Sequence, residues 1–211
     1  MDLNIYSYFL FYFIILFSVV GYGLFFSYVT NVSSISKNFG YAGLLGLFFL
    51  TIYSYISNFF FAHGLIHNSI LIWLGIFFYL YFVRKNTYKK KEILSIILIF
   101  LILFISILIF KTHDDFSYYH FAYSYYLTQS SSYIGIGPFN HGFKTQSSIF
   151  YLNSLFYLPI VKYYMFHMPA VLIIGFSNII LLNKIFKNIK DKSINFITFF
   201  CRRFNKFHIR N

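Results

Sequence analysis

The chain has 211 residues, of which 59% are hydrophobic and only 10% are charged, and its formal net charge is +12. A soluble domain carries about 25% charged residues, so this composition excludes an ordinary soluble globular protein. The single cysteine, Cys201, excludes a framework of disulfides within the chain and a metal cluster held by cysteines.

Five apolar runs follow one another along the chain, each close to the length of about 20 residues that crosses a hydrocarbon core of about 30 Å. The third run is the least regular, because His67 and Asn68 stand at its start. We therefore predict an all-α fold, a polytopic bundle of about five transmembrane helices. The runs lie near Ile5–Val29, Tyr41–Ala62, Ile66–Val83, Ile93–Phe110 and Tyr163–Asn183.

These runs divide the chain into three predicted regions. Residues 1–92 form a membrane region of three spans, and residues 93–183 hold two spans that flank a long loop over 111–162. Residues 184–211 form a basic tail. A loop of this length is uncommon unless it is functional or disordered, so we expect it to be the functional element.

The basic residues predict the orientation in the membrane. Fourteen Lys and Arg fall on one side of the predicted spans, at position 37, over 84–91 and in the tail, and three fall on the other, at Lys111, Lys144 and Lys162. Positive residues are retained on the cytoplasmic face. We therefore expect the N-terminus outside and the tail inside. The positive charge then faces the anionic lipids of the bilayer, and no nucleic acid is expected as a partner.

The long loop opens with two adjacent acids, Asp114 and Asp115, in a chain that has only five acidic residues. An aromatic stretch over 115–127 predicts a short helix at the membrane interface, and residues 147–159 predict a second one that leads into the last span. The turn-rich stretch 130–142 connects them. An aspartate before a short helix can cap it. The pair can also bind a divalent cation, supply a general base, or pair with Lys111.

The loop resembles part of a known enzyme class on two segments, HDDFSYYHFAYSYYL at 113–127 and PFNHGFKTQSSIFYLNSLFYLP at 138–159. It resembles the GT-C class of glycosyltransferases, which use a polyprenyl-phosphate-linked sugar donor at the outer face of the membrane and carry an essential acid in their first outer loop. The resemblance covers residues 93–183. It is also similar to a group of bacterial envelope proteins with an HDDFxYYH segment.

This resemblance implies a function in the assembly of envelope glycans, in the inner membrane of a bacterium. Asp114 or Asp115 would be the catalytic base that deprotonates the acceptor hydroxyl, and a divalent cation or a lysine would neutralise the departing lipid phosphate. The implied substrate-binding residues are Lys111, His113, Tyr118, Tyr119, His120, Asn140, His141 and Lys144. GT-C proteins have more spans than this chain, so we expect the N-terminal piece of a longer enzyme, a truncated inactive relative, or a partner membrane subunit.

Two other classes of function stay open. His63 and His67 are four residues apart and are a candidate ligand pair for a metal ion at the outer face, although Gly64 argues against a helix there. A non-enzymatic subunit whose loop docks a partner is the other. A transporter is not expected, because the spans lack ionisable residues that would mark a pathway. Small faces at Gly21 and over 40–46 predict close helix packing, within the chain or with a partner.

Overall fold

The computed structural model describes residues 4–32, 38–85, 90–109, 114–131, 135–144 and 147–190. Every regular element in these ranges is helical, which confirms the predicted all-α fold. The long helices are α1 (Ile5–Val29), α2 (Phe39–Phe60), α3 (Leu65–Lys85), α4 (Lys90–Leu108) and α7 (Met168–Lys190). The short ones are the π-helix η1 (Phe116–His120), α5 (Phe121–Gln129), α6 (Ser148–Leu155) and the 3₁₀ turns η2 (His141–Lys144) and η3 (Tyr163–Met165).

Four stretches of helix in the described part are long and apolar enough to cross a membrane: α1, α2, α3 and Tyr163–Lys187, which holds η3 and most of α7. The fourth predicted span corresponds to α4, whose apolar stretch Glu92–Leu108 is shorter than the other four. Bulky side chains such as Trp73 and Phe77 are exposed on α3. The protein is therefore a membrane protein, and this face of α3 contacts lipid.

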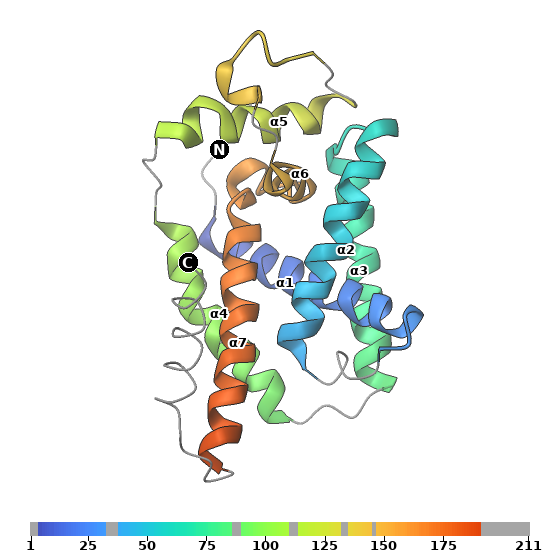
Figure 1. Cartoon of the computed structure of the whole chain (residues 1–211), viewed down its shortest axis with the longest axis vertical. Coiled ribbons are helices and arrows are strands. Elements are labelled where there is room, and N and C mark those ends of the chain that lie inside the picture. Colours follow the sequence, from blue (N-terminus) through green and yellow to red (C-terminus); the bar gives the residue numbers. More distant parts are fainter. Residues whose placement is uncertain are drawn as a thin grey trace, which may run out of the picture.

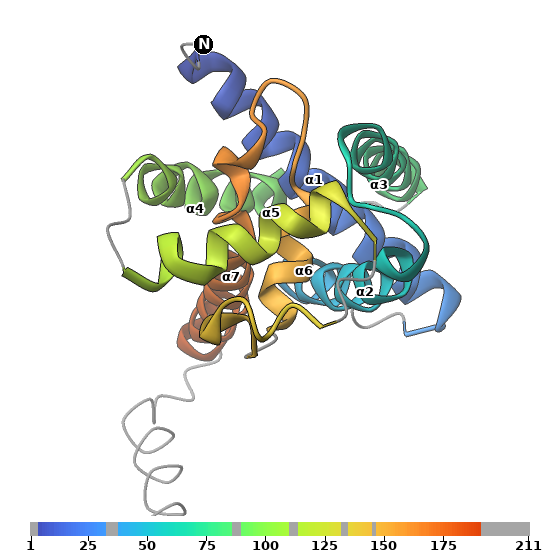
Figure 2. The ribbon, with the colours of Figure 1, turned by 90° about the horizontal axis from the view of Figure 1, so that it is seen from above.

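Helix α1 is the central helix of the bundle. It crosses the long axis obliquely in Figure 1 and runs between α2 and α3 in Figure 2, in contact with both. All seven residues of Ser18–Leu24 are buried, as expected for a helix that is apolar all round. The hydroxyl of Tyr12 donates to the carbonyl of Phe100 on α4 at 2.7 Å, and that of Tyr22 donates to Leu71 on α3 at 2.7 Å.

Glycines set the closest approaches between these helices. A Cβ atom at Gly21 would overlap the backbone carbonyl of Gly75 on α3, and one at Gly46 on α2 would overlap the carbonyl of Val19. The glycines at 40 and 43 lie against α7. The small faces seen in the sequence are therefore used for packing within the chain.

The elements η1, α5, η2 and α6, which we call the platform, lie together across one end of the bundle (Figure 1). They bury a small apolar core of Tyr123, Leu127, Phe143 and Phe150. The basic ends of α3 and α7 lie at the opposite end of the bundle. The first predicted interfacial helix is present, as η1 followed by α5.

The second predicted loop helix is shorter than expected. It ends at Leu155 as α6, and the chain then forms a hairpin in which the amide of Lys162 donates to the carbonyl of Leu158 at 2.7 Å. Ile160 and Lys162 have positive φ angles of 70° and 43°. Pro159 has no amide hydrogen to continue a helix, so the prediction of a helix through 159 was wrong.

Candidate functional site

The aspartate pair lies exposed at the start of η1. Asp115 has helical backbone angles and its side chain makes no capping hydrogen bond, so the capping interpretation is wrong for this residue. The carbonyl of Asp114 accepts a hydrogen bond from the Ser117 hydroxyl at 3.1 Å. Lys111 and His113 lie outside the described residues, so their predicted roles stay predictions.

The aromatic residues of η1 divide between solvent and the platform. Tyr118 is exposed, whereas Tyr119 and His120 are half-buried. The Tyr119 and His120 rings lie edge to face with centroids 4.4 Å apart, and the His120 ring lies 4.9 Å from that of Phe150 on α6. Two of the three predicted binding side chains of η1 therefore contribute to packing within the platform.

Asn140 joins η2 to η1. Its Nδ2 donates to the carbonyl of Tyr118 at 3.1 Å, and its Oδ1 accepts from the amide of Gly142 at 2.8 Å. His141 and Lys144, the neighbouring predicted binding residues, are exposed. The structure thus brings Asn140 next to the predicted residues of η1, but both ends of its amide are already used in hydrogen bonds within the protein.

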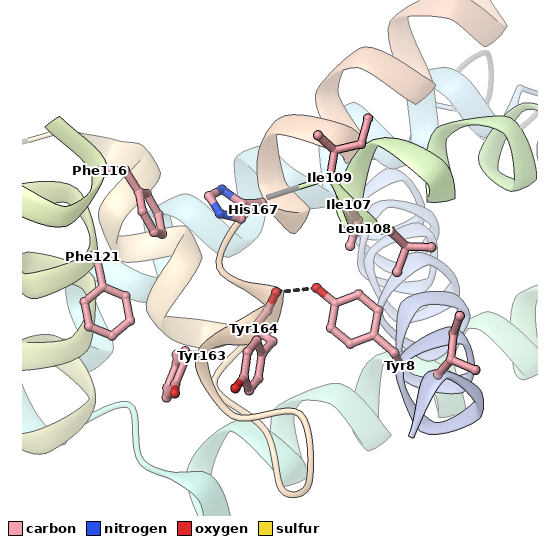
Figure 3. Close-up of a pocket in the computed structure, with 10 residues that line it drawn as sticks. Tyr8, Ile107, Leu108, Ile109, Phe116, Phe121, Tyr163, Tyr164 and His167 are labelled. Atoms are coloured by element: carbon pink, nitrogen blue, oxygen red, sulfur yellow. Dashed lines mark hydrogen bonds between the residues drawn. The ribbon is translucent and has the colours of Figure 1, made fainter. Parts of the chain in front are cut away.

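An apolar cavity of about 480 Å³ lies beside η1, at the end of the bundle that carries the platform (Figure 3). Its walls come from the start of α1, the end of α4, the η1–α5 segment and the residues before α7. The only hydrogen bond drawn across it runs from the Tyr8 hydroxyl to the Tyr164 carbonyl, at 2.7 Å. The lining residues are Ile5, Tyr8, Ile107, Leu108, Ile109, Phe116, Phe121, Tyr163, Tyr164 and His167.

The chemistry of this cavity suits a hydrocarbon chain with a polar group at one end. Volumes of about 300–1,000 Å³ with mostly apolar walls and a few polar groups are usual for small-ligand sites. The polar groups here are tyrosine hydroxyls and the imidazole of His167, whose ring lies 4.5 Å from that of Phe116. Phe116, which lines the cavity, directly follows Asp115 in the chain, although neither aspartate lines the cavity.

A buried polar network, which the sequence did not reveal, holds the α2–α3 turn against the platform. His63 is fully buried; its Nδ1 lies 2.6 Å from Ser154 Oγ, and its Nε2 lies 3.0 Å from Ser57 Oγ. Ser154 Oγ donates to the carbonyl of Tyr151 at 2.7 Å, so it accepts from His63 Nδ1–H, whereas Ser57 Oγ also lies 3.4 Å from the carbonyl of Ser54. Burial, with a smaller effect of the neighbouring His67, lowers the pKa of His63 to about 3, which keeps the imidazole neutral.

Asn68 is the centre of the same network. Its Nδ2 lies 2.8 Å from the carbonyl of His63, 2.8 Å from that of Ser154 and 3.0 Å from that of Tyr157. Its Oδ1 lies 2.9 Å from Nδ1 of His67. The only signal in the sequence was the polar start of an otherwise apolar span, because the partners lie up to 89 residues away.

The structure gives no support to a metal site at the histidine pair. His63 lies in the turn before α3, and its ring is 5.3 Å from that of His67. Both nitrogens of each ring have hydrogen-bond partners, those of His67 being Tyr53 and Asn68. Within the described ranges, no three His, Cys, Asp or Glu side chains come together as a metal-binding group.

The fold and the site define the class as an all-helical membrane protein with an apolar cavity at the platform end of its bundle. Comparison of the chain with protein-family models, with curated proteins and with solved structures finds no match. The functional argument therefore depends on the residues of this chain alone.

Proposed function

We propose that this protein acts in the assembly of cell-envelope glycans, as a GT-C-like glycosyltransferase or as a truncated, inactive relative of one. The apolar cavity would hold part of the chain of a polyprenyl-phosphate sugar, and the aspartate pair would act at the sugar. The observation that carries the proposal is the position of Asp114 and Asp115 directly before Phe116, which is part of the cavity wall. A carboxylate in water beside a hydrocarbon site is the arrangement that a lipid-linked sugar requires.

The proposed reaction is a single displacement at the anomeric carbon. A carboxylate of the pair takes the proton of the acceptor hydroxyl while the oxygen of that hydroxyl forms a bond to the anomeric carbon. The bond between the carbon and the lipid phosphate breaks, and the phosphate leaves with the electron pair. Among the described cations near the platform, Lys144 and Lys162 are exposed and available to stabilise this charge, as a divalent cation would be.

The proposed location is the inner membrane of a bacterium, with the platform and the N-terminus outside. The support is the distribution of charge along the bundle. Arg84 and Lys85 end α3 and Lys184 and Lys187 lie near the end of α7, and both helix ends are remote from the platform (Figure 1). Positive residues at one end of a bundle favour that end in the cytoplasm.

The test is the phenotype of Asp114→Asn and Asp115→Asn in the native host, measured as the ladder of envelope glycan at a verified protein level. Glu92→Gln is the matched control, because it is the same acid-to-amide change at the start of α4, remote from the platform. Loss of the ladder in an aspartate variant, with Glu92→Gln normal, would support the proposal. A normal ladder in both aspartate variants would contradict catalysis by the pair.

A second candidate function is that of a non-enzymatic membrane subunit whose platform docks a partner. The observation that favours it is the exposure of Asp114, Asp115, His141 and Lys144, none of which lines the cavity. Leu108→Trp, a change in the cavity wall, separates the two functions. It would block a lipid-linked donor and abolish the ladder if the protein is the enzyme, and it would leave a docking subunit functional.

A further inference from the structure

A second depression lies at the turn between α2 and α3, and we call it the groove. Its volume is about 770 Å³, and Phe61, Ile66, Ile70, His67, Gln129 and Tyr157 are among its lining residues. Tyr157 precedes the Leu158–Lys162 hairpin and Tyr163 follows it. Tyr157 lines the groove and Tyr163 lines the cavity, so the hairpin connects the two sites along the chain, and the two sites share no lining residue.

One wall of the groove consists of apolar side chains near the end of α2 and the start of α3. Helix α2 ends at Phe60 and α3 begins at Leu65, and both are long and apolar enough to cross a membrane. Phe61, Ile66 and Ile70 are exposed between and beside these helix ends. In a membrane whose hydrocarbon ends where these two helices end, the apolar wall of the groove would face the border between lipid chains and head groups.

The rest of the lining includes uncharged polar groups that can form hydrogen bonds with a ligand. Gln129 donates from Nε2 to Thr128 Oγ1 at 2.8 Å, and no partner for its Oε1 is found among the described residues. The hydroxyl of Tyr157 makes no hydrogen bond within the same ranges, and a tyrosine hydroxyl is protonated at neutral pH and can donate. His67 has no free nitrogen. No Lys, Arg, Asp or Glu of the described part lines the groove.

We propose that the groove binds a membrane lipid whose head group is uncharged and carries hydroxyl groups. Phe61, Ile66 and Ile70 hold a chain of this lipid, and Gln129 and the Tyr157 hydroxyl bond its head group. An anionic head group would be desolvated here without a positive partner, which is unfavourable. This site is separate from the cavity and does not depend on the proposed function.

The experiment uses the full chain in nanodiscs of phosphatidylcholine and two photoactivatable probes with the same diazirine-bearing chains. One probe is a diacylglycerol and the other is phosphatidic acid, and mass spectrometry maps the labelled peptides. We expect the diacylglycerol to label residues 61–70 and 128–129 about three- to tenfold more strongly, because phosphatidic acid brings a negative charge that finds no positive partner among the described lining residues. Equal labelling by both probes would mean that lipid touches this face only as bulk solvent, and it would overturn the proposal.

Three variants make this experiment more specific. Ile70→Trp fills the groove from a side chain that is 64% exposed, and it should remove the labelling of the groove while leaving that of the cavity peptide 107–121 unchanged. Ile102→Trp is the matched control, since Ile102 is 71% exposed on α4 and lines neither site. Gln129→Leu should reduce the preference between the probes. Groove labelling that survives Ile70→Trp would also overturn the proposal, whatever the glycan ladder shows.

Discussion

The buried amide of Asn68 gives the sharpest test of how the platform is held. Replacing it by leucine keeps the branched shape of the side chain, enlarges it and removes both hydrogen-bonding ends. The change leaves the carbonyls of His63, Ser154 and Tyr157, and Nδ1 of His67, without the partner that they have in the folded protein. Because Asn68 is fully buried, water cannot replace these bonds without opening the structure.

The size of the effect follows from the number of bonds. The amide has two hydrogens, which serve the three carbonyls, and a buried polar group that loses its partner costs about 1–3 kcal/mol. The expected loss in the free energy of unfolding is therefore about 2–6 kcal/mol. For a chain of this size, 1 kcal/mol corresponds to about 2–4 °C in Tm, so Tm should fall by at least about 4 °C. Asn68→Asp should cost at least as much, because it places an oxygen opposite three carbonyl oxygens.

The assay is thermal unfolding in detergent micelles, followed by far-ultraviolet circular dichroism, together with the rate of tryptic cleavage at Lys144. Ser69→Ala is the matched control, since its hydroxyl donates only to the carbonyl of Leu65 one turn earlier, and Tm should be nearly unchanged. A fall of less than about 2 °C for both Asn68 variants would refute the reasoning, because it would correspond to less than one buried hydrogen bond.

Three further predictions follow. His63→Gln should remove a dependence of the free energy of unfolding on pH. The pKa of His63 is about 3 in the folded protein and 6.5 ordinarily, so the stability of the wild type is full above pH 6.5 and falls below it by up to about 1.4 kcal/mol per pH unit. Denaturation at a series of pH values measures this, and the same slope against pH in the wild type and the variant would contradict it. Gly75→Ala should lower the free energy of unfolding by about 1–3 kcal/mol or more, because the added Cβ forces α1 and α3 apart. Gly64→Ala is the control and should leave it unchanged, because its Cβ would lie 3.9 Å from the nearest neighbouring atom. Equal Tm values for the two variants would contradict the close approach of α1 and α3. In a cysteine-free background, Lys144→Cys should react with an impermeant thiol reagent added outside whole cells and Lys187→Cys should not, and the reverse result would invert the proposed orientation.

The membrane helices could be predicted from the sequence because the signal is local. A run of about 20 apolar residues is visible without knowledge of any partner, and each long helix lies where such a run was found. The central position of α1 was not predictable in the same way. The composition of Ser18–Leu24 resembles that of the other apolar spans. Only the packing of α2 and α3 on both sides shows that this part of α1 is buried and does not face lipid.

The candidate site was predicted only in part, because its bonds join distant segments. The helix that follows the aspartate pair was predicted from local composition. The engagement of Asn140 with Tyr118, 22 residues earlier, and of His63 with Ser154, 91 residues later, was not. Each of these residues has the same appearance in the sequence whether it binds a substrate or another part of the chain. Long-range contacts decide between the two, and periodicity carries no information about them.

The polar network contacts the segment of the chain that connects the cavity and the groove. Asn68 donates to the carbonyls of Ser154 and Tyr157, in the segment that leads into the Leu158–Lys162 hairpin, and this hairpin connects a residue of the groove to a residue of the cavity. Positive φ angles at Ile160 and Lys162 cost on the order of 1–3 kcal/mol each, so the hairpin persists only because its surroundings hold it. Leu158 and Val161 are buried below it, and Asn68 fixes its base. Backbone strain of this kind is common at functional sites, so the hairpin between Tyr157 of the groove and Tyr163 of the cavity is a candidate functional element in its own right.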